Sequence, residues 1–158
     1  EGVIIPPPAG EAAATPIDVS GIINVAELLE GPFQTEADGR CFQRLVLRDN
    51  FIGGVDPAIV GSARINFSMI MEKPCAEITG PDSADHVWNA TGTFTGTIGA
   101  AQGTFDFTYL ATVVEGGMFR STLIIQQGTG ELAGIHGLLF EDGPLVPDEG
   151  YTGWIYLD

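Results

Sequence analysis

The sequence predicts an all-β protein, a single eight-stranded antiparallel β-barrel, and two observations carry this prediction. Long stretches alternate strictly between polar and apolar residues. In TGTFTGTIG, residues 91–99, a column of threonines faces away from Phe94 and Ile98. Such a period of two is typical of antiparallel strands with one wet and one buried face. In addition, no segment of ten or more residues follows the 3.6-residue period of a helix.

Taken in order, the chain begins with an extended arm and continues as one domain. Residues 1–16, EGVIIPPPAGEAAATP, contain four prolines, which fix φ and donate no hydrogen bond. Residues 17–158 then form the barrel domain, and VAELLEG at 25–31 is too short for a helix of consequence. The expected strands are 17–29, 42–53, 60–72, 86–98, 103–114, 118–127, 132–140 and 150–157. Closure removes exposed edges, and a barrel of this size either fills with side chains or holds one small ligand.

Charge excludes several classes of partner. The 158-residue chain contains six Lys and Arg residues and 21 Asp and Glu residues, which gives a net charge of −15. Nucleic acids and anionic membrane surfaces repel such a protein, so neither is an expected partner. No run of 18 apolar residues is present, so no membrane span is expected.

Three features favour the secretory pathway or the extracellular space. The first residue is Glu1 rather than Met, the cysteine count is even, and two N-glycosylation sequons begin at Asn66 and Asn89. Asn66 lies two residues from Arg64 and therefore on the same face of its expected strand. Asn89 lies on the same face as the threonines of 91–97. Both are therefore expected to point outward, where a glycan must be. The alternative is that both sequons are unused.

The two cysteines are expected to form a disulfide. Cys41 begins the second expected strand and Cys75 ends the third, and both are equidistant from the proline turn near residue 58. A hairpin folded about that turn brings them within bonding reach. The cross-link should contribute about 3–4 kcal/mol in the chain-entropy model. Two free buried thiols are the alternative.

Conventional catalytic and metal sites find no support in the sequence. His86 and His136 have no metal-ligand spacing around them, and His136 is expected at the surface end of a strand. No Gly-x-Ser-x-Gly motif is present, and GTGELAG at 128–134 lacks the Lys-Ser/Thr ending of a phosphate loop. We therefore expect neither a metal nor a cofactor.

The interior is expected to be an apolar, substrate-binding cavity. By parity its walls are Phe67, Met69, Met71, Trp88, Phe94, Phe105 and Phe107, joined by Phe119, Leu123 and Ile125. Gly92 and Gly96 also face inward and are expected to leave room between the rings. The polar candidates for a catalytic role are Tyr109, Gln127 and Glu27. Two alternatives remain open: a plainly packed core, and a first strand that ends by residue 26 and leaves Glu27 in solvent.

Two motifs resemble a known family. GTGELAGIHG at 128–137, followed by the C-terminal GYTGWIYLD, and TGTFTGTIGAAQGTFDF at 91–107 resemble hairpins of the allene-oxide-cyclase-like barrels. These include an uncharacterised bacterial family and, more distantly, plant dirigent proteins. The resemblance covers residues 85–158. In physical terms Gly128 and Gly130 permit a tight turn, and Gly134 and Gly137 let a coiled strand bend.

The resemblance implies a function as well as a fold. Similar barrels include pericyclases of natural-product biosynthesis, among them fungal hetero-Diels–Alderases that join a tropolone quinone methide to a humulene-type sesquiterpene. The expected activity is therefore that of a cofactor-independent cyclase acting on an apolar polyene or terpenoid substrate. The alternatives are a secreted, non-catalytic barrel that binds a hydrophobic small molecule, and a dirigent-like protein that steers radical coupling. A homodimer is left open.

Overall fold

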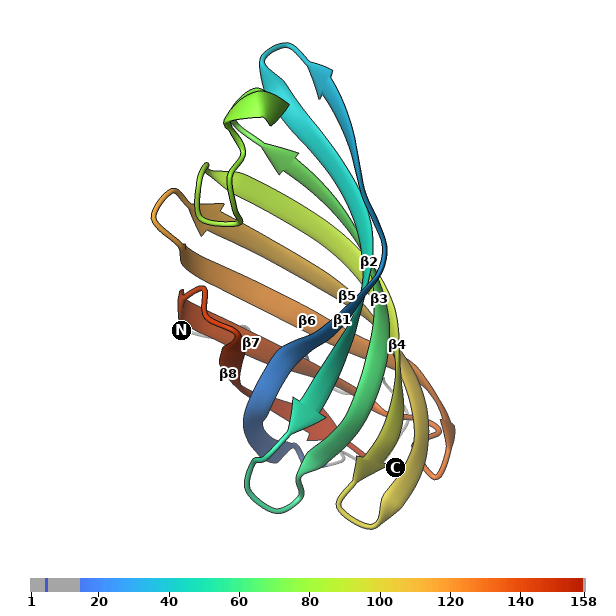
Figure 1. Cartoon of the computed structure of the whole chain (residues 1–158). Coiled ribbons are helices and arrows are strands. Elements are labelled where there is room, and N and C mark those ends of the chain that lie inside the picture. The colour runs from blue at the N-terminus through green and yellow to red at the C-terminus, as the bar shows by residue number, and fades with distance from the viewer. Residues whose placement is uncertain (1–4, 6–14, 158) are drawn as a thin grey trace.

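The all-β prediction is confirmed. The structure, a computed structural model, describes residues 5 and 15–157, so the predicted arm at 1–16 lies almost entirely outside the described residues. Eight antiparallel strands form one sheet that closes in a ring (Figure 1). The strands are β1 (Ile17–Ala37), β2 (Arg40–Ile52), β3 (Ile59–Met71), β4 (His86–Ile98), β5 (Ala101–Val114), β6 (Met118–Gly130), β7 (His136–Pro144) and β8 (Asp148–Tyr156). A 3-10 turn, η1 (Cys75–Glu77), is the one helical element among the described residues, none of which belong to a helix able to span a membrane.

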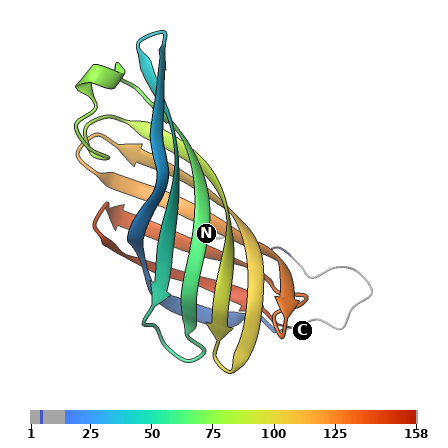
Figure 2. The same ribbon diagram turned by 45° about the vertical axis from the view of Figure 1, so that its right-hand side comes forward.

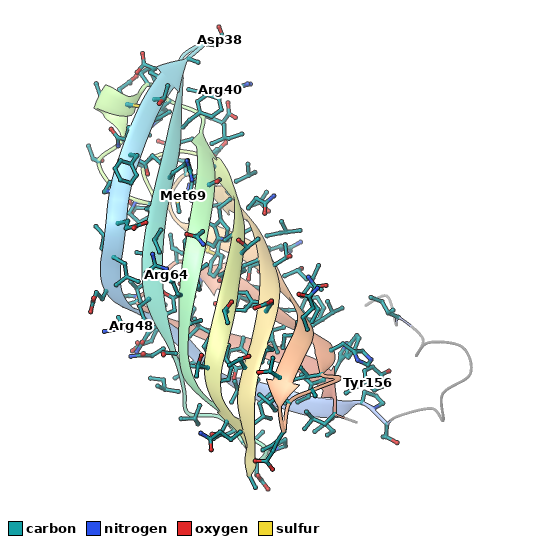
Figure 3. All side chains as sticks on the ribbon, turned by 90° about the vertical axis from the view of Figure 1, so that its right-hand side faces the viewer. Asp38, Arg40, Arg48, Arg64, Met69 and Tyr156 are labelled. Carbon is teal, nitrogen blue, oxygen red and sulfur yellow. A yellow bond between two sulfur atoms is a disulfide. The ribbon has the colours of Figure 1, made fainter. Side chains whose placement is uncertain are left out.

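Each strand pairs with its neighbours in the chain, and β8 pairs back onto β1 to close the ring. Only Ile17–Asn24 of β1 take part in that closure, whereas pairing with β2 continues from Ile22 to Ala37. The outer part of the β1–β2 hairpin therefore extends beyond the ring, as Figure 2 shows. Asp38 stands at its tip, far from Tyr156 near the opposite end (Figure 3).

One half of the interior is filled by aromatic rings. This packed half lies toward the β2–β3 and β4–β5 turns, where Phe94 stacks on Phe105 with ring centroids 4.5 Å apart. Phe51 meets Phe94 edge to face at 5.2 Å, and Phe107 adjoins both Phe51 and Phe105. All four rings are almost completely buried. The packed-core alternative is thus correct for this half of the ring.

The inward glycines serve this packing and leave no open space. A Cβ at Gly92 would collide with the ring of Phe107, and one at Gly96 would collide with the ring of Phe94 and the Val60 carbonyl. The expectation that these glycines leave room between the rings is therefore wrong, because the rings themselves fill it.

The glycine-rich motif forms the turn between β6 and β7. Gly130 ends β6 with φ +63°, and Gly134 has φ +82°, both in the left-handed region that favours glycine. Strand β7 begins at His136, four residues later than predicted, because residues 131–134 form the turn itself. The motif thus shapes the chain as expected, but Gly134 lies in the turn rather than in a bending strand, and Gly128 lies within β6 rather than in the turn.

The disulfide prediction is confirmed. Cys41 and Cys75 are bonded, with their Cα atoms 4.7 Å apart. The hairpin register places Met71 opposite Cys41, so Cys75 lies beyond the end of β3, in η1. The bond therefore ties the β3–β4 connection to the start of β2.

The outward facing of both sequons is also confirmed. Asn66 on β3 and Asn89 on β4 are exposed, and so is most of the threonine column of β4. Occupancy of these sites by glycans stays a prediction.

Candidate functional site

The other half of the interior is hollow. A cavity of about 650 Å³ lies inside the ring, toward the end that carries the β3–β4 and β7–β8 connections. We call this half of the ring the hollow half. Most of the lining is apolar. The walls are Ile23, Val25, Leu45, Leu47, Phe67, Met69, Met71, Trp88, Tyr109 and Phe119, and the connections contribute Ile78, Gly80, Pro81, Leu145, Val146 and Pro147.

A polar layer marks the boundary between the packed and hollow halves. On β5 the last inward residue of the packed half is Phe107, and the next inward residue is Tyr109. On β2, Asp49 stands two residues from Phe51 in the same way. Two further strands repeat the pattern, with Leu123 followed by Ser121 on β6 and Leu139 followed by Glu141 on β7. Period-two alternation therefore gathers one polar side chain from each of four strands at one level of the ring.

Three members of this layer are joined by hydrogen bonds. Glu141 Oε1 accepts one from the Tyr109 hydroxyl and another from Ser121 Oγ, the latter at 2.8 Å. All three residues are buried, and Tyr109 and Glu141 also line the cavity. Burial, with the Glu141 charge beside it, raises the pKa of the Tyr109 hydroxyl well above its usual range. Tyr109 is thus held neutral, as a donor to Glu141.

The carboxyl groups of Glu141 and Asp49 are the most perturbed acids of the site. Burial raises the pKa of Glu141 from 4.5 to about 7, against the opposing effect of its two hydrogen bonds. Burial, reinforced by the nearby Glu141 charge, raises the pKa of Asp49 from 3.8 to about 7. Near neutral pH each group is therefore able to hold or release a proton, which is the property of a general acid or base.

Each of these carboxyl groups has an oxygen without a partner. Asp49 Oδ1 and Glu141 Oε2 find no hydrogen-bond partner among the described residues, although both side chains are only 4% exposed. The indole Nε1 of Trp88 and the Nε2 of His86 are likewise buried and unpartnered. Since buried polar atoms are normally satisfied, these four atoms are hydrogen-bonding groups that the described residues leave without partners.

His86 lies at the rim of this site. Its Nδ1 is 3.2 Å from the Ala84 carbonyl oxygen, and its ring packs at 5.8 Å from that of Trp88. Burial lowers the pKa of the imidazole, so the ring is neutral at physiological pH. His136, by contrast, lies outside the cavity at the start of β7, stacked on Tyr156.

The predicted site residues divide into three groups. Phe67, Met69, Met71, Trp88 and Tyr109 line the cavity as expected. Phe94, Phe105 and Phe107 face inward as expected, but they belong to the packed half and do not line the cavity. Glu27 and Gln127 do not face the interior, and their predicted interior placement is wrong.

Irregular strand geometry explains both errors. Between Val25 and Glu27 the β1–β2 register shifts, which reverses the parity used to place Glu27. Glu27 instead forms a surface ion pair with Arg48 at 2.7 Å. On β6 a register shift falls opposite Thr104 and Asp106, and Gln127 adopts φ +53° there, with its side chain exposed. The alternative, that β1 ends by residue 26 and leaves Glu27 in solvent, is right about the solvent and wrong about the strand, which continues to Ala37.

Sequence reasoning missed Asp49 and Glu141, although a signal was present. In RCFQRLVLRDNFI, Asp49 shares its parity with Cys41, Leu45 and Phe51. In HGLLFEDGP, Glu141 shares its parity with Leu139. An acid in phase with the apolar residues of a strand indicates a buried carboxyl group where the strand stays regular, as at Asp49 and Glu141, and not where a register shift intervenes, as at Glu27.

No metal cluster supplements this chemistry in the described part of the chain, where no three His, Cys, Asp or Glu side chains come together to hold an ion. The arrangement is an apolar cavity with hydrogen-bonding groups contributed by several strands around the ring.

Comparison with known proteins extends to the fold alone. No protein-family model matches the chain, and no curated protein matches it. The crystal structure of a protein of unknown function from the DUF3224 family of Shewanella oneidensis MR-1 is similar, with a TM-score of 0.68 and 18% sequence identity. The match covers 91% of this chain and 99% of that chain. It supports the closed antiparallel architecture and assigns no activity.

Proposed function

We propose that this protein is a cofactor-independent cyclase that takes a largely apolar, oxygen-bearing polyene into the hollow half and promotes a (hetero-)Diels–Alder cycloaddition. The observation that carries the proposal is the cavity of about 650 Å³, apolar over most of its lining, with two unpartnered carboxyl oxygens contributed by β2 and β7. A cavity of this size suits one terpenoid-sized molecule or two smaller partners. The resemblance of the two glycine-containing motifs to allene-oxide-cyclase-like barrels points the same way.

Confinement supplies the main rate effect in this proposal. In a hetero-Diels–Alder step two σ bonds form while three π bonds become one, and no atom leaves. Such a step needs no nucleophile and no metal. Holding the reacting ends in near-attack geometry removes several kcal/mol from the barrier, and about 7–11 kcal/mol in the best cases. Phe67, Trp88 and Phe119 are the rigid walls that would impose that geometry.

The polar layer supplies the second effect. A protonated Glu141 uses Oε1 to accept from Tyr109 and Ser121, which leaves the Oε2–H free to donate to a substrate oxygen in the cavity. A donor at that oxygen stabilises the charge that develops on a heterodiene during cycloaddition. The proton stays on Glu141 throughout. In this scheme Tyr109 is a positioning residue, which differs from the catalytic role expected from the sequence.

A non-catalytic barrel that binds a hydrophobic molecule is the second candidate, since its walls would look the same. The buried acids favour the cyclase over this candidate. A purely apolar ligand gains nothing from two carboxyl groups whose burial is costly.

The test is the stereochemistry of the product. The protein is incubated with an ortho-quinone methide precursor and a humulene-type polyene, and the enantiomeric excess and the rate are measured by chiral chromatography. We expect enantioenriched product formed faster than in buffer. Trp88→Ala should lower the selectivity, whereas Gln127→Ala, on the outer face, should change nothing. Racemic product at the uncatalysed rate would contradict the proposal.

A further inference from the structure

We infer that the molecule taken into the hollow half carries a protonated amine, so that the ligand class is a lipophilic ammonium compound. The inference deepens the proposed function and rests on it for the location of the site, with the ammonium group paired with Asp49 while Glu141 keeps its proton. It starts from the charges of the cavity wall rather than from the reaction.

The wall carries acids without matching cations. Asp49, Glu141 and Glu149 line the cavity, and no Lys or Arg side chain does. All six cationic side chains of the protein lie among the described residues, and all point elsewhere. Five of them form surface ion pairs, and Arg44 is exposed on the outer face of β2. The protein thus spends none of its cations on its buried acids.

The buried acids are also incompletely hydrogen-bonded. Asp49 and Glu141 are each 96% buried, and each has an oxygen without a hydrogen-bond partner among the described residues. A buried carboxylate is costly unless a cation and hydrogen-bond donors satisfy it. An N–H group of an ammonium ligand supplies both at once, which a neutral ligand does not.

The aromatic walls complement a cation in the same place. The rings of Trp88 and Tyr109 are 5.6 Å apart, that of Phe119 is 6.0 Å from Trp88, and that of Phe67 is 5.8 Å from Trp88. All four side chains line the cavity. The faces of such rings attract ammonium groups, most strongly where water is excluded. Carboxyl groups and aromatic rings together therefore favour an organic cation, and the cavity is far larger than an inorganic ion requires.

Long-range electrostatics act in the same direction. The net charge of −15 raises the local concentration of cations around the molecule. The titratable groups that line the cavity are Asp49 on β2, His86 on β4, Tyr109 on β5, Glu141 on β7 and Glu149 on β8. Of these only His86 can carry a positive charge, and burial lowers the pKa of its imidazole.

A pair of isosteric probes tests the inference. One is 3-cyclohexyl-N,N-dimethylpropylamine, and the other is its neutral counterpart with carbon in place of nitrogen. Binding is followed through Trp88 fluorescence in a Trp154→Phe background, which leaves one of the two tryptophans. At pH 8 we expect the amine to bind roughly 10-fold more tightly or better, the size typical of a desolvated charge contact.

Substitution of the acids identifies the cause. Asp49→Asn with Glu141→Gln should abolish the preference for the amine while leaving binding of the neutral probe. The matched control, Glu27→Gln with Glu131→Gln, removes the same charge from exposed positions and should retain the preference. Equal affinity of the two probes for the wild-type chain, or an undiminished preference in the interior double variant, would overturn the inference.

A second measurement needs no substitution of the acids and so does not depend on folding of the double variant. At pH 5.5 both carboxyl groups are protonated, and the preference of the wild-type chain for the amine should shrink, with the neutral probe unaffected. A preference that is the same at both pH values would overturn the inference. These measurements detect binding without reaction, so loss of amine preference and absence of cycloaddition product remain separate results.

Discussion

The packed and hollow halves of the ring are built by the same strands but differ in how their interior is filled. Toward the β2–β3 and β4–β5 turns, Phe94 and Phe105 stack, and glycines lie where any side chain would collide with the rings. At the opposite end, the same alternation of residues leaves a cavity and a polar layer that begins at Asp49 and Glu141. The difference indicates that the packed half provides stability, whereas the hollow half holds the candidate site.

The hollow half replaces packing with covalent and polar restraints. The Cys41–Cys75 disulfide lies at that end, and an Arg40–Glu72 ion pair accompanies it. The backbone N–H of Cys75 also donates to Glu36 on the extended part of β1 at 2.8 Å. A wall that encloses empty space makes fewer contacts than a filled core, so such restraints have more to contribute there.

The largest expected effect comes from truncating one ring in each half. Phe94→Ala should lower the free energy of unfolding by about 4 kcal/mol, because it leaves a void in a filled core. Phe67→Ala should cost about 2 kcal/mol, since one side of that ring faces the cavity and loses no contacts there. Urea unfolding of both variants measures the difference. Equal costs would mean that the two halves are packed alike.

Removal of the disulfide tests the restraints of the hollow half. Cys41→Ala with Cys75→Ala should lower the free energy of unfolding by about 3–4 kcal/mol, because the unfolded chain regains the freedom of a loop of 34 residues. Unfolding of the reduced wild-type protein provides an independent control. A cost below about 1 kcal/mol would show that packing alone holds this end together.

The buried acids should make stability depend on pH. The pKa values of Asp49 and Glu141 are raised to about 7 in the folded protein, so the folded state binds more protons than the unfolded state between about pH 4 and 7. Their protonation therefore favours folding at low pH, and that contribution is lost as the pH rises to about 7. We expect a loss of about 2–4 kcal/mol.

Variants separate this effect from the repulsion among surface acids. Asp49→Asn and Glu141→Gln should each flatten the dependence and raise the melting temperature above pH 7, whereas Glu27→Gln should leave its shape unchanged. An unchanged curve in both interior variants would place the titration elsewhere.

A smaller effect is expected from the hydroxyl of Tyr109. Tyr109→Phe should lower the cyclisation rate by roughly 10-fold, the size of one lost hydrogen bond. Because that bond lowers the pKa of Glu141, its removal should also move the pH at which activity falls to a higher value. The pH–rate profile measures both quantities. A lower rate with an unmoved profile would assign Tyr109 a purely structural role.

Much of this molecule was predictable because its strands are regular over most of their length. Strict alternation in β3, β4 and β5 placed Asn66, Trp88 and Phe105 on their correct faces. Parity failed at Glu27 and Gln127, where register shifts reverse it, and nothing in the composition of those segments marks the irregularity. The alternation shows which face of a strand a residue lies on, but not how far along the axis of the ring it lies. Phe94 and Phe67 therefore looked equivalent in sequence, although one is core and the other is cavity wall.

Only the apolar part of the site was predicted from the sequence. Its two acids, Asp49 and Glu141, lie on the same strand face as the buried apolar residues of β2 and β7, so their burial is implied by the alternation of those strands. The contacts between Glu141, Tyr109 and Ser121 join strands β5, β6 and β7, and depend on where the ring brings those strands to one level.

Methyl NMR distinguishes a ligand bound in the hollow half from one that disturbs the packed half. The methyl groups of Met and Ile report on both halves and on the exterior: Met69, Met71 and Ile23 line the cavity, Ile59 and Ile98 are buried in the packed half, and Met118 is exposed outside. The chain is titrated with farnesol, an apolar polyene alcohol. We expect the methyl chemical shifts of Met69, Met71 and Ile23 to change, and those of Ile59, Ile98 and Met118 to stay the same. Changes confined to Met118, or centred on Ile59 and Ile98, would contradict this expectation.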